Sequence, residues 1–162
     1  MRQKPETAGP PVAELTRRIM QRVGARDTSP ELAVRRALHR HGLRYILHDR
    51  RLPGRPDIVL PRWKTVIFVH GCFWHRHQGC RYATMPKTRT EFWAKKFERN
   101  VARDAANRRD LERLGWRVVE IWECDVKKRR FEDPLLSMFS HCRAAMQSIK
   151  ESSVEKIVAI KL

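Results

Sequence analysis

The sequence has few acidic residues, no long hydrophobic run and no internal repeat. Of its 162 residues, 18 are Asp or Glu. Its apolar stretches fall well short of the roughly 20 residues that a membrane-spanning helix needs, and no recurring segment suggests a solenoid. The opening segment, MRQKPETAGPPVAEL, lacks the apolar core of a secretory signal. These absences argue against a membrane-spanning or secreted protein, and we expect a cytoplasmic one.

Positive charge is what the chain has in excess. Its 35 Lys and Arg residues give a formal net charge of +17. Such an excess favours a polyanionic partner, because neutralised phosphates release their counterions. The basic residues are spread along the whole chain without a basic amphipathic anchor, which favours nucleic acid over a membrane surface. Four cysteines in a reducing compartment indicate metal or thiol chemistry more than disulfides.

Apolar spacing and turn residues predict one α/β domain. The segment DTSPELAVRRALHRHGL predicts a helix with Ser29 as N-cap, Pro30 in the first turn and Gly42 as the stop. Three strand candidates follow, LRYILH, DIVL and TVIFVH, and the short connection between the last two predicts a hairpin. A long helix is then predicted in TRTEFWAKKFERNVARDAANRRDLERLG, where Thr88 and Glu91 have the spacing of a capping box.

The remaining elements complete a sheet flanked by helices. WRVVEIWE alternates only weakly, which predicts a central strand that is buried on both faces. Asp133 and Pro134 open a last predicted helix with Cys142 on its apolar side. The order of elements predicts a single central mixed β-sheet with helices on its faces. We expect a basic N-terminal arm over residues 1–28, the main domain over 29–150 and a tail over 151–162.

A short loop concentrates residues that bind metals. In the stretch IFVHGCFWHRHQGC, an apolar run ends at a histidine and is followed by sulfur and imidazole side chains. Cys72, His77 and Cys80 from this loop, with Cys124 from the end of a later strand, would supply a tetrahedral Cys3His zinc site. The alternative, that Cys124 is a buried core thiol, stays open at this stage.

The same region carries the parts of a reaction centre. Asp57 stands at the entrance to a strand after PGRP, His70 ends the adjacent strand, and His75 follows five residues later. The hairpin could bring all three into one cleft. A carboxylate that holds Mg²⁺ and an imidazole that activates water are what phosphodiester hydrolysis needs. The competing interpretation is a turn carboxylate beside ordinary surface histidines.

Four strings carry a resemblance to a known family. LPGRPDIVL, VIFVHGCFWHRH, MPKTRTEFW and LGWRVVEIWEC, in that order, resemble the very-short-patch repair endonucleases, which are zinc-containing relatives of the restriction-endonuclease fold. The similarity runs from about Met20 to about Val126. It implies a restriction-endonuclease-like fold with a structural zinc, and a Mg²⁺-dependent enzyme. Such an enzyme nicks one strand 5′ of the thymine in a T·G mismatch left by deamination of 5-methylcytosine.

The resemblance also implies roles for individual residues. Asp57 would be the shared ligand of the catalytic magnesium ions, with the backbone carbonyl of Val69 as a further ligand. His75 would be the water-activating base, His70 its partner at the scissile phosphate, and Glu31 would assist through metal-bound water. The zinc ligands would be Cys72, His77, Cys80 and Cys124, on a loop that is one residue longer than the family pattern.

Contacts with DNA are the last implication of the resemblance. Phe73, Trp74 and Trp93 would enter the base stack from the major groove. Met20 and Val23 would clamp the minor groove, and Lys96 and Asn100 would reach base edges. The ordinary alternatives are core aromatics, a short amphipathic helix and a solvated helix face. The implied partners are double-stranded DNA with a T·G mismatch and the mismatch-repair and DNA-polymerase machinery, and we expect a monomer.

Three functional hypotheses therefore remain open at the level of sequence. The first is a mismatch-specific nicking endonuclease. The second is a restriction-type nuclease of the same fold that responds to another sequence or lesion. The third is a zinc-stabilised DNA-binding module without catalysis, against which the joint presence of Asp57, His70 and His75 argues.

Overall fold

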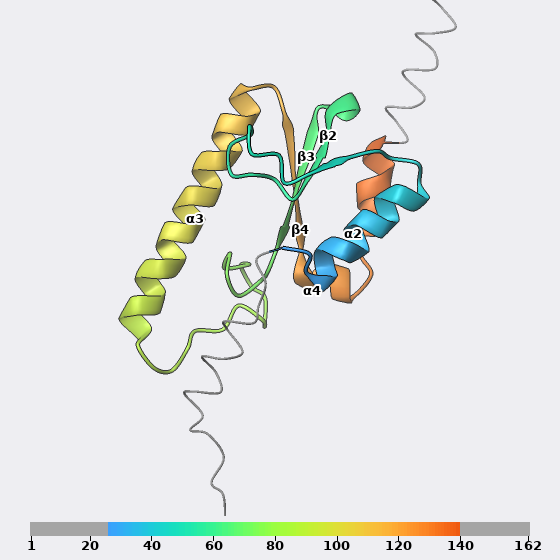
Figure 1. Ribbon diagram of the computed structural model, residues 1–162. Helices are drawn as coiled ribbons and strands as arrows, with labels where there is room; N and C mark the ends of the chain where they lie inside the picture. Colours follow the sequence, from blue (N-terminus) through green and yellow to red (C-terminus); the bar gives the residue numbers. More distant parts are fainter. Residues whose placement is uncertain (1–25, 140–162) are drawn as a thin grey trace, which may run out of the picture.

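The computed structural model describes residues 26–139, so Met20, Val23, Cys142 and the predicted tail over 151–162 lie outside the described residues. Its elements are α2 (Ser29–Arg40), β1 (Ile46–Leu47), β2 (Ile58–Leu60), the 3-10 helix η1 (Pro61–Trp63), β3 (Thr65–His70), α3 (Thr90–Arg113), β4 (Arg117–Trp122), α4 (Glu123–Lys127) and a last helical segment over 132–139 (Figure 1).

The strands form a four-stranded mixed sheet in the order β1-β2-β3-β4. β1 and β3 both run antiparallel to β2, which confirms the predicted hairpin, whereas β3 and β4 are parallel. β4 is an outer strand of the described sheet, so its prediction as a central strand was wrong. Its weak alternation has another cause, because helices lie against both faces of the sheet. The α/β class and the mixed sheet are as predicted.

The side chains of the strands alternate between two helical layers. Ile67 of β3 and Ile121 of β4 pack into the core cluster that α2 and the last helical segment share. Val66 and Val118, on the opposite face, pack with Leu111 of α3. In Figure 1, α3 accordingly lies on one side of the sheet, and α2 and α4 lie on the other. Even-numbered positions of β3 therefore face α3.

Both long helices begin differently from the sequence prediction. Thr28, not Ser29, is the N-cap of α2, and its hydroxyl lies 3.5 Å from the amide nitrogen of Glu31. α3 begins at Thr90 after Arg89, which has a left-handed backbone (φ 52) and no capping side-chain hydrogen bond. The predicted capping box of Thr88 was therefore wrong, because the left-handed residue separates Thr88 from the first turn.

Gly54 anchors the loop before β2 against α3. Its φ is +70, and a Cβ atom at this position would lie 2.7–2.9 Å from side-chain atoms of Asn107. Gly54→Ala should therefore destabilise the protein by about 2 kcal/mol, from the left-handed backbone and the forced shift of Asn107. Gly115→Ala is the matched control, since Gly115 has φ +75 with no atom within 4 Å of its Cβ position. If urea unfolding showed equal losses of unfolding free energy in Gly54→Ala and Gly115→Ala, the close approach of Asn107 would not explain the effect.

Candidate active site and metal cluster

The strand register brings Asp57 to the end of β3. Ile58 lies opposite Ile67, so Asp57, one residue earlier, reaches the last residues of β3. Its Oδ2 accepts a hydrogen bond from the backbone nitrogen of Val69 at 2.7 Å. The backbone nitrogen of His48 donates to the carbonyl oxygen of Asp57 at 3.3 Å. The family resemblance implied that Asp57 and Val69 are metal ligands, and the two residues are thus direct neighbours in the structure.

The environment of Asp57 disfavours its negative charge. Burial raises the pKa of this carboxyl group above its usual value, and the negative charge of Glu31 adds to the rise. The hydrogen bond from Val69 acts in the opposite direction but does not compensate. A bound cation would favour the ionised form of Asp57. A carboxylate is the hard oxygen ligand that Mg²⁺ prefers, so the chemistry of Asp57 fits such an ion.

The two predicted catalytic histidines form a stack beside Asp57. The rings of His70 and His75 lie 3.9 Å apart with an interplanar angle of 2°. His70, on the α3 face of β3, is 6% exposed, and burial lowers its pKa to about 3. His70 is therefore neutral at physiological pH.

Asp104 of α3 completes this group, although no sequence pattern pointed to it. Its Oδ2 lies 2.6 Å from Nδ1 of His75. Burial acts to raise the pKa of Asp104, but the hydrogen bond and the charge of His75 outweigh burial and hold the pKa below its usual value. An ionised Asp104 accepts the Nδ1 proton of His75. The other nitrogen, Nε2, is then free to take a proton, which is the arrangement of a general base.

The stacked histidines open to a pocket between α3 and β4. Its volume is about 450 Å³, and His70, His75, Asp104, Arg108 and Trp122 are among its lining residues. Arg108 lies 2.8 Å from Glu120, so part of its charge is already paired. The pocket gives the reactive nitrogen atoms access to a substrate.

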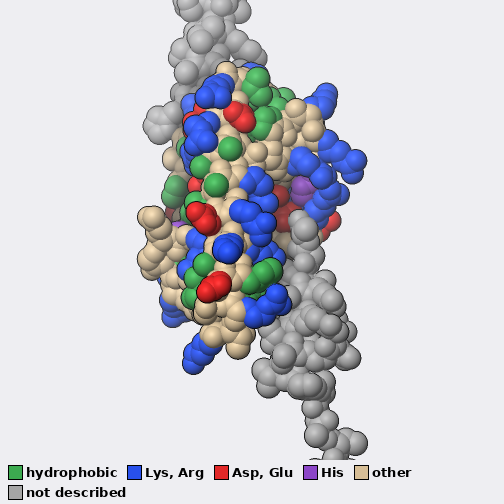
Figure 2. All heavy atoms as spheres, turned by 90° about the vertical axis from the view of Figure 1, so that its left-hand side faces the viewer, with side chains coloured by type: hydrophobic (Ala, Val, Ile, Leu, Met, Phe, Trp, Pro, Cys, Tyr) green, Lys and Arg blue, Asp and Glu red, His purple; other side chains and the backbone are tan. Residues whose placement is uncertain are grey.

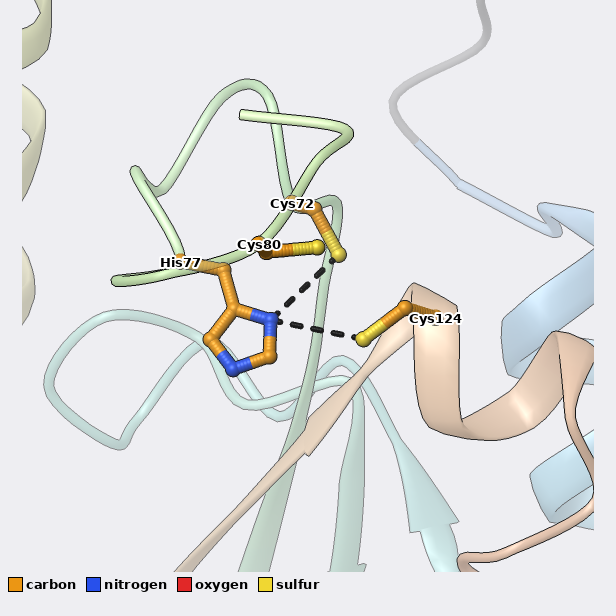
Figure 3. A group of neighbouring side chains, drawn as sticks. All are labelled: Cys72, His77, Cys80 and Cys124. Atoms are coloured by element: carbon orange, nitrogen blue, oxygen red, sulfur yellow. Dashed lines mark hydrogen bonds between the residues drawn. The ribbon is translucent and has the colours of Figure 1, made fainter. Parts of the chain in front are cut away.

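The four predicted zinc ligands come together at the same end of the sheet (Figure 3). Their ligand atoms all lie within 4.8 Å of one another. Nδ1 of His77 is 3.6 Å from the sulfur of Cys72 and 3.4 Å from that of Cys124. Tetrahedral zinc, with bonds of about 2.3 Å to sulfur and 2.0 Å to nitrogen, requires about 3.5 Å between such atoms. The cluster, which Cys80 completes, therefore fits a zinc ion.

The parallel register explains why distant cysteines meet here. His70 of β3 pairs with Trp122 of β4. Cys72 and Cys124 each come two residues after this pair, so they lie at the same end of the two strands. The ring of Trp122 stacks on His77 at 4.1 Å and contacts His70 edge-on at 5.4 Å. Cys124 is thus a member of the cluster rather than an isolated core thiol.

The thiols of the cluster differ in acidity. Burial raises the pKa of Cys72 to about 12 and also raises the pKa of Cys124. A hydrogen bond from the backbone of Tyr82 lowers the pKa of Cys80. Zinc binds thiolates, so its binding must release protons from the two buried cysteines.

The predicted DNA-contacting aromatics form a second cluster next to this loop. The ring of Phe73 lies 5.0 Å from that of Trp74 and 5.7 Å from that of Trp93. Nζ of Lys96 lies over both indole rings, at 5.1 and 5.4 Å. Asn100 donates a hydrogen bond to the carbonyl of Trp74 at 3.1 Å, so one of its donors holds the loop. The structure thus unites these five residues, which sequence separates by up to 27 positions.

The face of the molecule that carries α3 is basic. In Figure 2, Lys and Arg side chains gather over this face among few acidic ones. The exposed basic side chains of α3 include Lys95, Arg99, Arg103 and Arg109. Exposed cations of this kind suit a phosphate backbone, which they position without reading its sequence.

Comparison with known proteins agrees with this geometry. Residues 13–81 match the family model described as DNA mismatch endonuclease Vsr. The type II nicking enzyme V.XorIIP of Xanthomonas oryzae is 49% identical over 113 residues, which cover 70% of this chain and 82% of that protein. DNA mismatch endonuclease Vsr of Escherichia coli is 44% identical over 110 residues, covering 68% and 70%. The type II nicking enzyme V.NmeAIP of Neisseria meningitidis is 42% identical, covering 68% and 79%.

The fold, the site and these similarities define a DNA endonuclease, a hydrolase of phosphodiester bonds that nicks DNA or acts at mismatches. More specifically, the chain belongs to the Vsr DNA mismatch endonuclease family. DNA is accordingly its substrate. Among the described residues, no helix has both the length and the apolar character that crossing a membrane requires.

Proposed function

We propose that this endonuclease requires Mg²⁺ and nicks one strand on the 5′ side of the thymine in a T·G mismatch. The observation that carries the proposal is that Asp57, which accepts a hydrogen bond from the backbone nitrogen of Val69, lies near enough to the His75–Asp104 pair for the charge of His75 to act on its pKa. The similarity to the protein named DNA mismatch endonuclease Vsr supports the choice of a mismatch as the trigger.

Each catalytic residue has a definite task in this proposal. Asp57 and the Val69 carbonyl would hold Mg²⁺, which would polarise the scissile phosphate and stabilise its developing charge. Nε2 of His75 takes a proton from the attacking water, and Asp104 stabilises the imidazolium that results. His70, neutral and stacked on His75, holds that ring in place and faces the phosphate. Glu31 assists through water, close enough to Asp57 to influence its pKa.

Recognition of the mismatch is assigned to the aromatic cluster. We propose that Phe73, Trp74 and Trp93 enter the base stack, since unstacking costs less at a mispair than at a matched pair. Lys96 and Asn100 lie beside these rings and would reach base edges.

The domain organisation inferred from the sequence also remains a proposal. The endonuclease domain over 29–150 would be preceded by the basic arm over 1–28, with Met20 and Val23 clamping the minor groove, and followed by the tail over 151–162. The arm would contact the duplex from the side opposite the aromatic cluster. Partners in the mismatch-repair and DNA-polymerase machinery would act on the nicked product.

Asp104→Asn tests the assigned base directly. Loss of the carboxylate should lower the maximal nicking rate by about 10² to 10⁴, because His75 loses its oriented tautomer and the stabilisation of its charge. DNA affinity and zinc content should stay near those of the wild type. Asp110→Asn, on the same helix with its carboxylate near Arg113, is the matched control. An Asp104→Asn variant with the wild-type rate would remove Asp104 from the mechanism.

The proposed trigger is tested by comparing duplexes. Initial nicking rates should be measured on one sequence carrying a T·G mismatch, a T·A pair or an abasic site. The proposal expects cutting of the T·G duplex and no detectable cutting of the T·A duplex. Equal cutting of both would leave a nuclease with a different trigger, and binding without any cutting would favour the non-catalytic module.

A further inference from the structure

A buried arginine and a histidine connect the two carboxylates assigned to the metal site. We propose that Arg35 and His48 form a positioning bridge that fixes Glu31 relative to Asp57 and thereby sets the affinity of the active site for Mg²⁺. This inference rests on the proposed function, because it concerns the same metal site. Neither residue is a metal ligand or a catalytic group in this proposal.

The Glu31 end of the bridge is rigid. Glu31 is 3% exposed. Its Oε2 accepts hydrogen bonds from Nη2 of Arg35 at 2.9 Å and from the backbone nitrogen of Asp27 at 3.1 Å, and its Oε1 accepts one from the hydroxyl of Thr28 at 2.8 Å. Both carboxylate oxygens are therefore fixed. The guanidinium of Arg35, itself 7% exposed, compensates the buried negative charge.

The same guanidinium determines which nitrogen of His48 carries the proton. Nη2 of Arg35 lies 3.0 Å from Nε2 of His48. Because a guanidinium can only donate, Nε2 must accept, and the ring proton must be on Nδ1. Nδ1 in turn lies 3.9 Å from Oδ1 of Asp57. Arg35 thus places the ring proton of His48 on the nitrogen that lies 3.9 Å from Asp57.

The bridge joins α2 to the paired strands at this end of the sheet. Glu31 and Arg35 belong to α2, whereas His48 and Asp57 flank the paired strands β1 and β2. The backbone hydrogen bond from His48 to Asp57 fixes the second end of the bridge. The buried carboxylate of Glu31 and the partly buried one of Asp57 repel each other, and the negative charge of Glu31 raises the pKa of Asp57 after the larger effect of burial. A connection between them is needed to hold both near one ion.

Arg35 contacts a group of side chains that could otherwise hold a second metal ion. The ligand atoms of Asp27, Glu31 and His48 lie close enough together to hold a cation. Arg35 already contacts all three, with its Nη1 at 2.5 Å from Oδ1 of Asp27. The guanidinium of Arg35 therefore supplies the positive charge that a bound cation would bring, and we assign Arg35 the role of orienting metal ligands. Residues that orient metal ligands in this way typically change metal affinity when they are replaced.

The tautomer of His48 provides a test without any enzyme assay. ¹⁵N-histidine NMR should be recorded on the zinc-loaded full chain without Mg²⁺, at a pH well above the ordinary pKa of histidine. The His48 signals, identified by their loss in His48→Asn, should report protonation at Nδ1. Arg35→Lys, which keeps the charge but lacks the planar fork of donors, should weaken this preference. Protonation of wild-type His48 at Nε2 would overturn the bridge.

Metal affinity provides the second test. His48→Ala should weaken Mn²⁺ binding, measured by electron paramagnetic resonance without DNA, by about 10- to 100-fold. The Mg²⁺ concentration for half-maximal nicking of a T·G duplex should rise by a similar factor, with a near wild-type rate at saturating Mg²⁺. His48→Asn should recover part of the loss, because asparagine tolerates the left-handed backbone of His48 (φ 49) and offers an amide donor near Asp57.

The controls separate this inference from the proposed function. Arg40→Met removes a cation from the same helix, at an exposed pair with Glu132, and should leave both metal measurements unchanged. Unchanged Mn²⁺ affinity in His48→Ala, or a lower saturating rate at an unchanged Mg²⁺ requirement, would overturn the bridge. A wild-type chain that fails to cut the T·G duplex would instead contradict the proposed function, while the Mn²⁺ and NMR measurements still decide the bridge.

Discussion

Asp57→Ala should lower nicking by about 10³-fold or more while the protein stays folded and keeps its zinc. Loss of the carboxylate removes the proposed shared ligand of Mg²⁺, and several kcal/mol of transition-state stabilisation correspond to this factor. The zinc cluster uses other residues, Cys72, His77, Cys80 and Cys124. Single-turnover nicking rates and zinc content by atomic emission would be measured on the same preparation.

The stability of this variant is part of the prediction. Burial raises the pKa of Asp57, so the carboxylate ionises more readily in the unfolded chain than in the folded one. The ionised group therefore costs stability relative to the protonated one as the pH rises through this range, so the stability of Asp57→Ala should fall less steeply with rising pH there than that of the wild type. A residue that costs stability and is needed for activity is expected in an active site.

Asp49→Asn is the matched control for this experiment. Asp49 lies in the loop before β2 and pairs with Arg51 at 2.7 Å, so its substitution should leave nicking unchanged. A full nicking rate in Asp57→Ala would contradict the assignment of the metal ligand. Loss of zinc in that variant would mean that the two metal sites had been confused.

Cys124→Ser should lose zinc and more than about 4 kcal/mol of folding stability. Its sulfur lies 3.4 Å from Nδ1 of His77, and the cysteine joins the start of α4 to the loop of residues 72–80. Structural zinc contributes folding free energy directly, so one missing ligand should release the ion and loosen this connection. Zinc content and urea unfolding with and without chelator would measure both effects.

The wild type treated with chelator is the natural comparison. Chelation should reduce its stability toward that of Cys124→Ser and should change the stability of the variant little. A Cys124→Ser protein that retains full zinc and wild-type stability would remove Cys124 from the site. His41→Gln, at a partly exposed position near Glu132, serves as a control that should keep zinc.

Local patterns predicted those parts of the fold that local interactions decide. The segment TVIFVH was predicted as a strand, and β3 covers the same residues, because η1 and Gly71 bound a run of apolar and β-branched side chains. The start of α3 was misjudged because the left-handed backbone of Arg89 is set by the loop rather than by the capping pattern. The position of β4 was misjudged because weak alternation reports helices on both faces and not the place of a strand in the sheet.

The site could be predicted where residues lie close in sequence or carry unusual chemistry. Cys72, His77 and Cys80 stand within one short loop, and Cys124 was a candidate because few cysteines were available. Asp104 carried no such signal, since it lies among many charged residues of α3 and becomes significant only where that helix passes over His75. The bridge of Arg35 and His48 was likewise invisible, because the packing of α2 against the sheet brings Arg35 to His48, and the β1–β2 register brings His48 to Asp57.

A map of the cut on each strand would test the proposed reaction and its trigger together. Each strand of a duplex with one T·G mismatch, placed in a site where cytosine methylation is expected, would be end-labelled in turn and incubated with Mg²⁺ or with EDTA. We expect a single nick, in the thymine strand, immediately 5′ of the mispaired thymine, and no nick with EDTA. Cutting of both strands, cutting elsewhere, or cutting that persists in EDTA would contradict it.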